Sequence, residues 1–146
     1  MCSSINELWA VYILHAIPFF MSAKILPIDM LYFKSVAILM HDVYNNLTPL
    51  NILNLFTSLH EVHKYNTRSS SNNNFDVKHS RLNKQNKSFS RTGARIWNSI
   101  PADLHNFSKN KFKKTLHDIL FSILIEEEDY VDLPKIIRKL QNTKIK

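Results

Sequence analysis

The sequence has only one glycine, Gly93, and one cysteine, Cys2, in 146 residues. Loops that cradle phosphate groups need several glycines, because the backbone has to come close to the ligand, so P-loop and dinucleotide-binding fingerprints are excluded. One cysteine cannot form an internal disulfide or a thiolate zinc site, so nothing points to an oxidising compartment. The cellular location stays undetermined, with an intracellular one favoured.

Catalytic and metal-binding signatures are also scarce. His60-Glu61-Val62-His63 is one residue short of the helical zinc motif, in which histidines four residues apart converge on one ion. The contiguous acids of residues 126–129 point in different directions and are expected to form a solvated turn. No serine and histidine can be singled out as a catalytic pair. We therefore expect no enzyme activity, no metal, no cofactor and no small-molecule substrate.

Positive charge is concentrated in the middle of the chain, within a net charge of +7. Residues 1–60 carry two cations and three anions, residues 61–95 carry eight and two, and residues 96–146 carry nine and seven. Such a basic segment is typical of proteins that bind nucleic acid, an acidic partner or an anionic membrane surface. A solvated polar loop is an equally good interpretation of the charge pattern alone.

Apolar periodicity predicts a mainly α-helical protein with one modest core. Residues 27–60 are expected to form a helical segment, with one helix over 27–46 and a shorter one over 49–59. Residues 89–141 are expected to form a helical tail, and residues 142–146 a frayed basic end. The predicted core-facing stripe of the first helix is Phe33, Val36, Ala37, Met40, Val43, Tyr44 and Leu47.

Residues 1–26 form an apolar amino-terminal segment, and the run Leu8–Ile28 is nearly all apolar. His15 and Lys24 interrupt this run within the length that a membrane span requires. Glu7 stands where a signal peptide would carry a cation. A buried or interfacial helix is favoured, with a membrane anchor and a signal peptide as the alternatives.

Residues 61–88 read as a long, basic, polar loop without helical periodicity. Phe75-Asp76-Val77 alternates in polarity, and a short β-hairpin that pairs it with Ser88-Phe89 is the alternative to an irregular loop. Tyr65, Phe75 and Phe89 lie among the cations, which fits neutralisation of a nucleic-acid backbone combined with base stacking. The expected fold is a small irregular helical assembly with this loop in its middle.

The stretch "KSFSRTGARIWNSIPADL" predicts a structural elbow before a basic helix. We expect Gly93 to permit close packing, Trp97 to anchor the turn in the core, and Pro101 to redirect the chain into the helix that buries Phe112. Four lysines stand at the beginning of that helix, where cations are unfavourable next to the helix dipole. A role other than helix stability is therefore indicated for them.

Several segments together resemble a known family. "HKYNTRSSSNNNF", "KHSRLN", "KSFSRTGARIWNSIPADL" and "SKNKFKKTLHDILFSIL" are similar to the carboxy-terminal tail of non-LTR (LINE-type, jockey-like) retrotransposon reverse transcriptases. "HAIPFF" and "KILPIDMLYFKSVAILMHDVYNNLTP" resemble the helical segment that precedes that tail. The resemblance runs from about His15 to about Leu140, and residues 1–14 do not match it.

This resemblance implies a non-catalytic fragment of an RNA-directed DNA polymerase. The family's polymerase uses paired aspartates in a Tyr/Phe-x-Asp-Asp turn, and this chain has no Asp-Asp pair. What the resemblance implies instead is a tail that lies behind the polymerase thumb and helps to hold RNA or DNA. The implied partners are RNA or single-stranded DNA and the missing polymerase domains.

The candidate nucleic-acid-binding residues are the cations of the basic middle and of the following helix. They are Lys64, Arg68, Lys78, Arg81, Lys84, Lys87, Arg91, Arg95, Lys109, Lys111, Lys113 and Lys114. The alternative function is that of a small, basic, membrane-associated protein anchored by residues 8–28.

Overall fold

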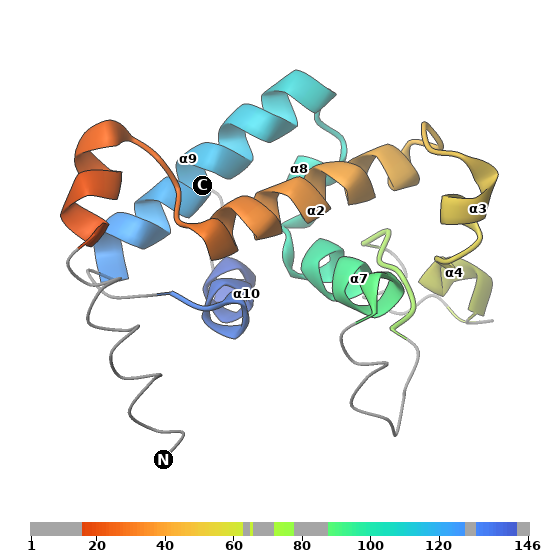
Figure 1. The fold of residues 1–146 in the computed structure, drawn as a ribbon. Coiled ribbons are helices and arrows are strands. Elements are labelled where there is room, and N and C mark those ends of the chain that lie inside the picture. The colour runs from red at the N-terminus through yellow and green to blue at the C-terminus, as the bar shows by residue number, and fades with distance from the viewer. Residues whose placement is uncertain (1–15, 63–64, 66–71, 78–87, 128–130, 143–146) are drawn as a thin grey trace, which may run out of the picture.

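The computed structural model describes residues 16–62, 65, 72–77, 88–127 and 131–142. This part of the chain is mainly α-helical, which confirms the predicted fold class (Figure 1). The β-structure among these residues is a single antiparallel bridge between Ser58 and Phe75. No described helix is both long enough and apolar enough to cross a membrane.

The central element is α2 (Ile28–Tyr44), which packs against α7, α9 and α10. Pro27 precedes the helix and Asp29 lies in its first turn, where a carboxylate interacts favourably with the helix dipole. Leu47 was expected on the inward stripe, but this is wrong, because its side chain is 68% exposed. The helix ends at Tyr44, and Asn46 adopts a left-handed φ of 56° that turns the chain away.

The single helix predicted over 49–59 is also wrong. The structure has two short helices instead, α3 (Leu50–Leu53) and α4 (Leu59–Val62). The intervening backbone pairs with a distant segment, since Leu59 N donates to Asn74 O at 2.9 Å and Asp76 N donates to Thr57 O at 2.8 Å. The same pairing rules out the alternative hairpin with residues 88–89, because Phe89 already begins α7.

The carboxy-terminal half contains α7 (Phe89–Ser99), α8 (Ala102–His105), α9 (Lys109–Glu127) and α10 (Leu133–Asn142). Pro101 separates α7 from α8, since proline disfavours a helical conformation in the residue before it. Asp132 caps α10 by accepting a hydrogen bond from Lys135 N at 3.0 Å. Together these helices make up the described part of the helical tail that the sequence predicts over residues 89–141.

Part of the predicted acidic turn belongs to α9 and is not simply solvated. Glu127 forms ion pairs with Lys135 and with Lys139, the latter at 2.5 Å, and Glu126 lies 3.9 Å from Lys139. Two lysines of α10 therefore tie this helix to the end of α9. The remaining acids of that turn lie outside the described residues.

The described part of the amino-terminal segment is helical over residues 16–23 and precedes α2. Ile17 and Leu26 are buried in the core. Phe19, Ile25 and Ile28 instead point outward, with exposed fractions of 74%, 51% and 75%. This segment packs one face on the protein and leaves apolar side chains in solvent.

Candidate nucleic-acid interface

Trp97 lies at the centre of the core, fully buried between α2, α8 and α9. Its indole stacks on His105 with ring centroids 4.1 Å apart and lies 6.3 Å from the Phe112 ring. Its Nε1–H donates to Asn73 O at 3.1 Å, so the one polar group of the indole is satisfied. The tryptophan thus joins the elbow to a segment more than twenty residues earlier in the chain.

Asn98 holds the same earlier segment through both ends of its carboxamide. Phe75 N donates to Asn98 Oδ1 at 2.9 Å, and Asn98 Nδ2 donates to Phe75 O at 2.8 Å. The side chain therefore satisfies both backbone groups of Phe75, as a neighbouring strand would. Residues 72–75 are fixed against the end of α7 as a result.

Gly93 allows α7 to lie directly on α2. A Cβ atom at this position would lie 2.8 Å from Met40 Sδ and 3.3 Å from the Phe56 ring. Both distances are shorter than ordinary contacts, so a side chain here requires its neighbours to move. This is the close approach that the sequence indicates for the glycine.

His41 of α2 fixes the segment that leads into α9. Its Nε2 lies 2.9 Å from Phe107 O and donates to it, while Asn45 Nδ2 lies 3.3 Å from Nδ1 and is placed to donate to it. The imidazole also stacks on Phe112, with ring centroids 4.6 Å apart. The first turn of α9 is therefore held in position by α2.

His105 is buried beneath Trp97 without a satisfied ring nitrogen among the described residues. The carbonyl groups of Asn72, Trp97 and Ile100 approach the ring with geometry too poor for full hydrogen bonds. Burial disfavours the charged imidazolium and lowers the pKa of His105 to about 4, although these carbonyls oppose part of the effect. The imidazole is therefore neutral at pH 7 and packs as an aromatic ring.

Two polar contacts align α2 and α9 as antiparallel neighbours. Lys34 Nζ lies 3.4 Å from His117 Nδ1, and Asp42 Oδ2 lies 2.7 Å from Lys109 Nζ. Moving from Lys34 to Asp42 along α2 corresponds to moving back from His117 to Lys109 along α9. The buried face of α9 consists of Phe112, Leu116, Leu120, Ile123 and Leu124.

The four lysines at the beginning of α9 have different environments. Lys109 is paired with Asp42, so its charge is largely balanced within the protein. Lys111 Nζ lies 3.9 Å above the Phe107 ring, a cation–π contact that leaves the ammonium group accessible. Lys113 is half-buried and Lys114 is exposed. Three cations therefore remain on the solvent side of the helix without an acidic partner in the described part of the chain.

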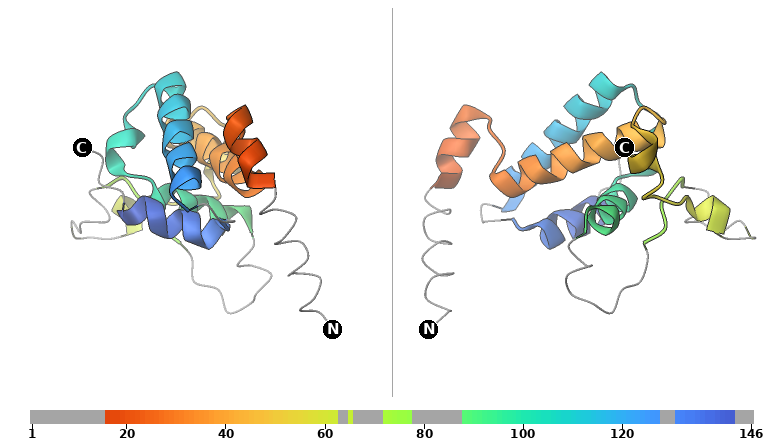
Figure 2. Two further views of the ribbon diagram at one scale, coloured as in Figure 1. Left: turned by 90° about the vertical axis from the view of Figure 1, so that its left-hand side faces the viewer. Right: turned by 45° about the vertical axis from the view of Figure 1, so that its right-hand side comes forward.

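The two described arginines of the basic middle lie elsewhere. Arg95 is exposed on α7, and Arg91 lies half-buried in the first turn of the same helix. Figures 1 and 2 show α7 on the opposite side of α2 from the beginning of α9. The fold does not join these arginines and the α9 lysines into one continuous patch. The predicted residues outside the described part of the chain are Lys64, Arg68, Lys78, Arg81, Lys84 and Lys87.

Of the three aromatic residues expected to stack on bases, two have structural roles. Phe75 is buried, and Phe89 is half-buried with its ring edge-on to Phe56 at 5.5 Å. The prediction of stacking is wrong for Phe75, because its ring is buried, whereas it stays a prediction for the half-buried Phe89. Tyr65 is 83% exposed and keeps its ring in solvent.

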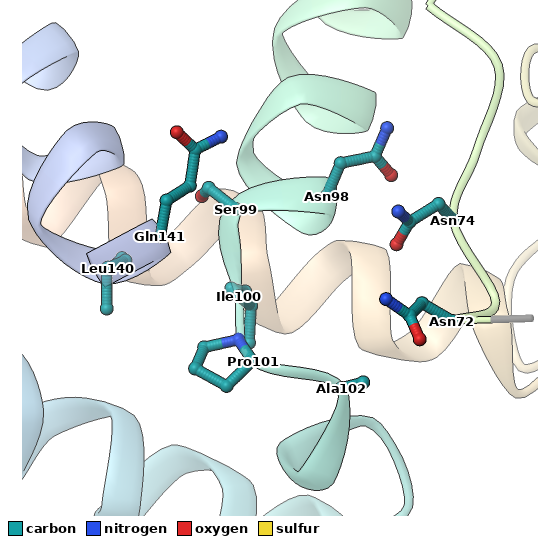
Figure 3. A pocket seen from close by; sticks show the side chains of 9 residues that line it. All are labelled: Asn72, Asn74, Asn98, Ser99, Ile100, Pro101, Ala102, Leu140 and Gln141. Atoms are coloured by element: carbon teal, nitrogen blue, oxygen red, sulfur yellow. The ribbon is translucent and has the colours of Figure 1, made fainter. Parts of the chain in front are cut away.

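Two hollows are lined entirely by described residues. A pocket of about 620 Å³ lies between the end of α2 and the α3–α4 segment, with Phe56 and Glu61 among its lining residues. A smaller pocket of about 190 Å³ lies beside the elbow and is lined by Asn72, Asn74 and Gln141, among others (Figure 3). The sequence offers one indication of this second pocket, which is its abundance of asparagine. That abundance does not predict which side-chain amides lie close together.

No three histidine, cysteine, aspartate or glutamate side chains gather into a metal-binding group within the described residues. The candidate site that remains is the surface formed by the lysines at the beginning of α9. The core around Trp97 holds this surface in place. No family model, no curated protein and no solved structure matches this chain.

Proposed function

We propose that this protein is a non-catalytic helical module that binds single-stranded RNA or DNA through the beginning of α9. The observation that carries the proposal is the set of three lysines, Lys111, Lys113 and Lys114, that lack an acidic partner among the described residues. They stand in the first turns of a helix, where the backbone dipole already disfavours cations. A polyanionic ligand offsets this unfavourable arrangement, whereas helix stability does not explain it.

The rigidity of the surroundings supports the same proposal. His41 holds the carbonyl of Phe107, and Asp42 holds Lys109, so α2 positions the chain immediately around the three lysines. Contacts of lysine with phosphate fix the orientation of a bound strand but carry no sequence information. We therefore propose modest, nearly sequence-independent affinity. The resemblance to the tails of LINE-type reverse transcriptases agrees with such a role, and we propose that origin for the module.

The test is a titration of labelled single-stranded RNA and DNA at several salt concentrations. Three phosphate contacts predict a slope of log affinity against log salt of about −2, from roughly −0.7 per contact on a single strand. The double variant Lys113→Glu/Lys114→Glu should weaken binding on all sequences and flatten this slope. No binding by the native protein at low salt would contradict the proposal.

The matched control is Lys24→Glu/Arg138→Glu, which changes the net charge equally. Both residues are exposed, and Arg138 lies on α10, which Figure 1 shows on the opposite side of α2 from the beginning of α9. This control should bind nearly as well as the native protein at physiological salt, because screening limits the reach of exposed charges to about 8–10 Å. An equal loss in both double variants would mean that only overall charge matters.

A second candidate function rests on the exposed apolar side chains near the beginning of α2. Phe19, Ile25 and Ile28 are accompanied on the next turn by Leu31 and Tyr32, which are 40% and 46% exposed. We propose association with a membrane surface as the alternative, because apolar side chains of this size gain free energy in the interfacial region of a bilayer. Flotation with anionic vesicles, compared with Phe19→Ser/Ile28→Ser, tests it. Binding that high salt abolishes would argue against apolar insertion.

A further inference from the structure

The pocket beside the elbow is small, uncharged and rich in carboxamide groups. Its volume is about 190 Å³, and none of its lining residues is ionisable. Figure 3 shows the turn of residues 98–102 between two walls, with Asn72 and Asn74 on one side and Leu140 and Gln141 on the other. Pockets for drug-sized ligands are generally larger than this, so the volume suits a single planar group.

The pocket is held open by hydrogen bonds of Trp97 and of Asn98, which is itself one of the lining amides. Trp97 Nε1 fixes Asn73, and Asn98 fixes Phe75, so the wall that carries Asn72 and Asn74 is attached to α7. Asn72 and Gln141 are exposed, and Asn74 is half-buried. They are therefore available to a ligand at a site whose shape is already formed.

The chemistry of this lining selects among ligand classes. A carboxamide presents one donor and one acceptor side by side, and this pair complements the edge of a nucleobase. Pro101 and Leu140 supply apolar surface for the faces of a planar ring, as apolar side chains do around unstacked bases. The absence of a cation in the lining makes the pocket unsuitable for a phosphate group.

We propose that this pocket receives one unstacked nucleobase of a bound single strand. The inference rests on the proposed function and adds a second contact to it. The pocket is close to the lysine surface along the chain, since α8 is the only element between Pro101 at the pocket and Phe107 beneath Lys111. Because an amide can turn over to exchange its donor and acceptor, the pocket accepts more than one base. It favours nucleic acid with bases over a bare sugar–phosphate chain.

The first test compares a single strand with an abasic strand of equal length. Two or three hydrogen bonds of modest net strength should give the strand with bases a preference of at least about fivefold. Asn72→Ala/Gln141→Ala should lose this preference and keep the salt slope of the native protein. Lys113→Glu/Lys114→Glu should do the reverse, with weaker binding to both strands and an unchanged preference.

The second test does not depend on phosphate contacts. Adenosine, which carries no charge, is titrated in the millimolar range while the side-chain amide signals of the protein are followed by NMR. Saturable shifts of the Asn72, Asn74 and Gln141 amides are expected, and the remaining Asn74 amide should no longer shift in Asn72→Ala/Gln141→Ala. The control Asn51→Ala/Asn54→Ala removes two exposed amides of the α3 region and should leave the shifts intact.

The outcomes separate the two proposals. A native protein that binds base-containing and abasic strands equally, or amides that adenosine does not shift, would overturn the pocket as a base site. Loss of strand binding with saturable adenosine shifts would overturn the lysine surface and leave the pocket in place. Equal melting temperatures of native protein and Asn72→Ala/Gln141→Ala establish that the comparison is between folded proteins.

Discussion

The two ends of α9 carry charges that oppose the helix dipole, but the protein treats them differently. The carboxyl end bears Glu126 and Glu127, and α10 supplies Lys135 and Lys139 to neutralise them. The amino end bears four lysines, and α2 supplies a single acid, Asp42, for Lys109. One end is therefore balanced by the fold, while the other presents surplus charge to solvent.

This difference distinguishes structural charge from charge that is available to a ligand. At the carboxyl end, the two lysines lower the pKa of Glu127, and Glu127 in turn raises the pKa of Lys139. Each charge there has an internal reason, namely the attachment of α10 to α9. The lysines beyond Lys109 have no comparable ion pair among the described residues, which is why we propose a nucleic-acid ligand for them.

Both ends depend on the core between them, so the largest effect is expected from Trp97→Ala. Emptying this fully buried site should lower the free energy of unfolding by about 3–5 kcal/mol. Small domains are only about 5–15 kcal/mol stable. The variant should therefore unfold at a much lower denaturant concentration than the native protein. The control Phe19→Ala removes a ring that is 74% exposed and should change stability little. Unchanged melting of Trp97→Ala would show that the tryptophan is peripheral.

As the pH falls, the contribution of His105 in the core should be lost before that of Glu127 at the carboxyl end of α9. The pKa of His105 is about 4 in the folded protein, below its ordinary 6.5, so the unfolded chain binds the proton first. The contribution of neutral His105 is complete above pH 6.5 and is lost as the pH falls towards 4, by an amount on the order of 3 kcal/mol.

The measurement is denaturant unfolding as a function of pH. His105→Phe keeps a ring against Trp97 but cannot ionise, so its stability should vary much less between pH 6.5 and 4. The pKa of Glu127 lies below its ordinary 4.5, and its contribution should therefore be lost only as the pH falls below that value. An equally steep decline in His105→Phe would assign the effect to another group.

Neutralising the acids at the carboxyl end of α9 should lower stability without lowering affinity for a single strand. Glu126→Gln/Glu127→Gln removes the ion pairs to α10, so the melting temperature should fall slightly at low salt. Because exposed pairs are screened, the difference from the native protein should diminish in 1 M salt. Affinity for a single strand should not decrease. Reduced affinity in this variant would remove the distinction between the two ends.

The smallest change in stability is expected from neutralising two lysines at the amino end of α9. Lys113→Gln/Lys114→Gln removes cations near a helix amino terminus, so unfolding should be unaffected or become harder by up to about 0.5 kcal/mol. Strand affinity, in contrast, should drop clearly. A marked loss of stability would mean that these lysines hold the fold together and are not reserved for a ligand.

The helices could largely be predicted because their signals are local. The apolar period, Pro27 before α2, Pro101 after α7 and Asp132 before α10 each act within a few residues of the boundary that they set. The break between α3 and α4 could not be predicted in this way. It follows from backbone hydrogen bonds between residues 57–59 and 74–76, which are distant in sequence.

The same distinction between local signals and contacts distant in sequence applies to the candidate sites. The lysines of α9 and their unfavourable position could be read from the sequence, since the helix and its direction were both predictable. The pairing of Lys109 with Asp42 could not, because it depends on the alignment of α9 against α2. The pocket of carboxamides was missed for the same reason, as its walls come from the 72–74 segment and α10.

Composition and periodicity alone thus establish a helical protein with a buried tryptophan elbow and a cationic helix start. Caps and the helix dipole act within a turn or two, and the spacing of apolar residues indicates which face of a helix is buried, so the order of residues is sufficient to reveal them. Which charges are neutralised, which aromatic rings remain exposed and which amides meet are decided by contacts between distant segments. Only the packing of α2 against α7, α9 and α10 brings those segments together.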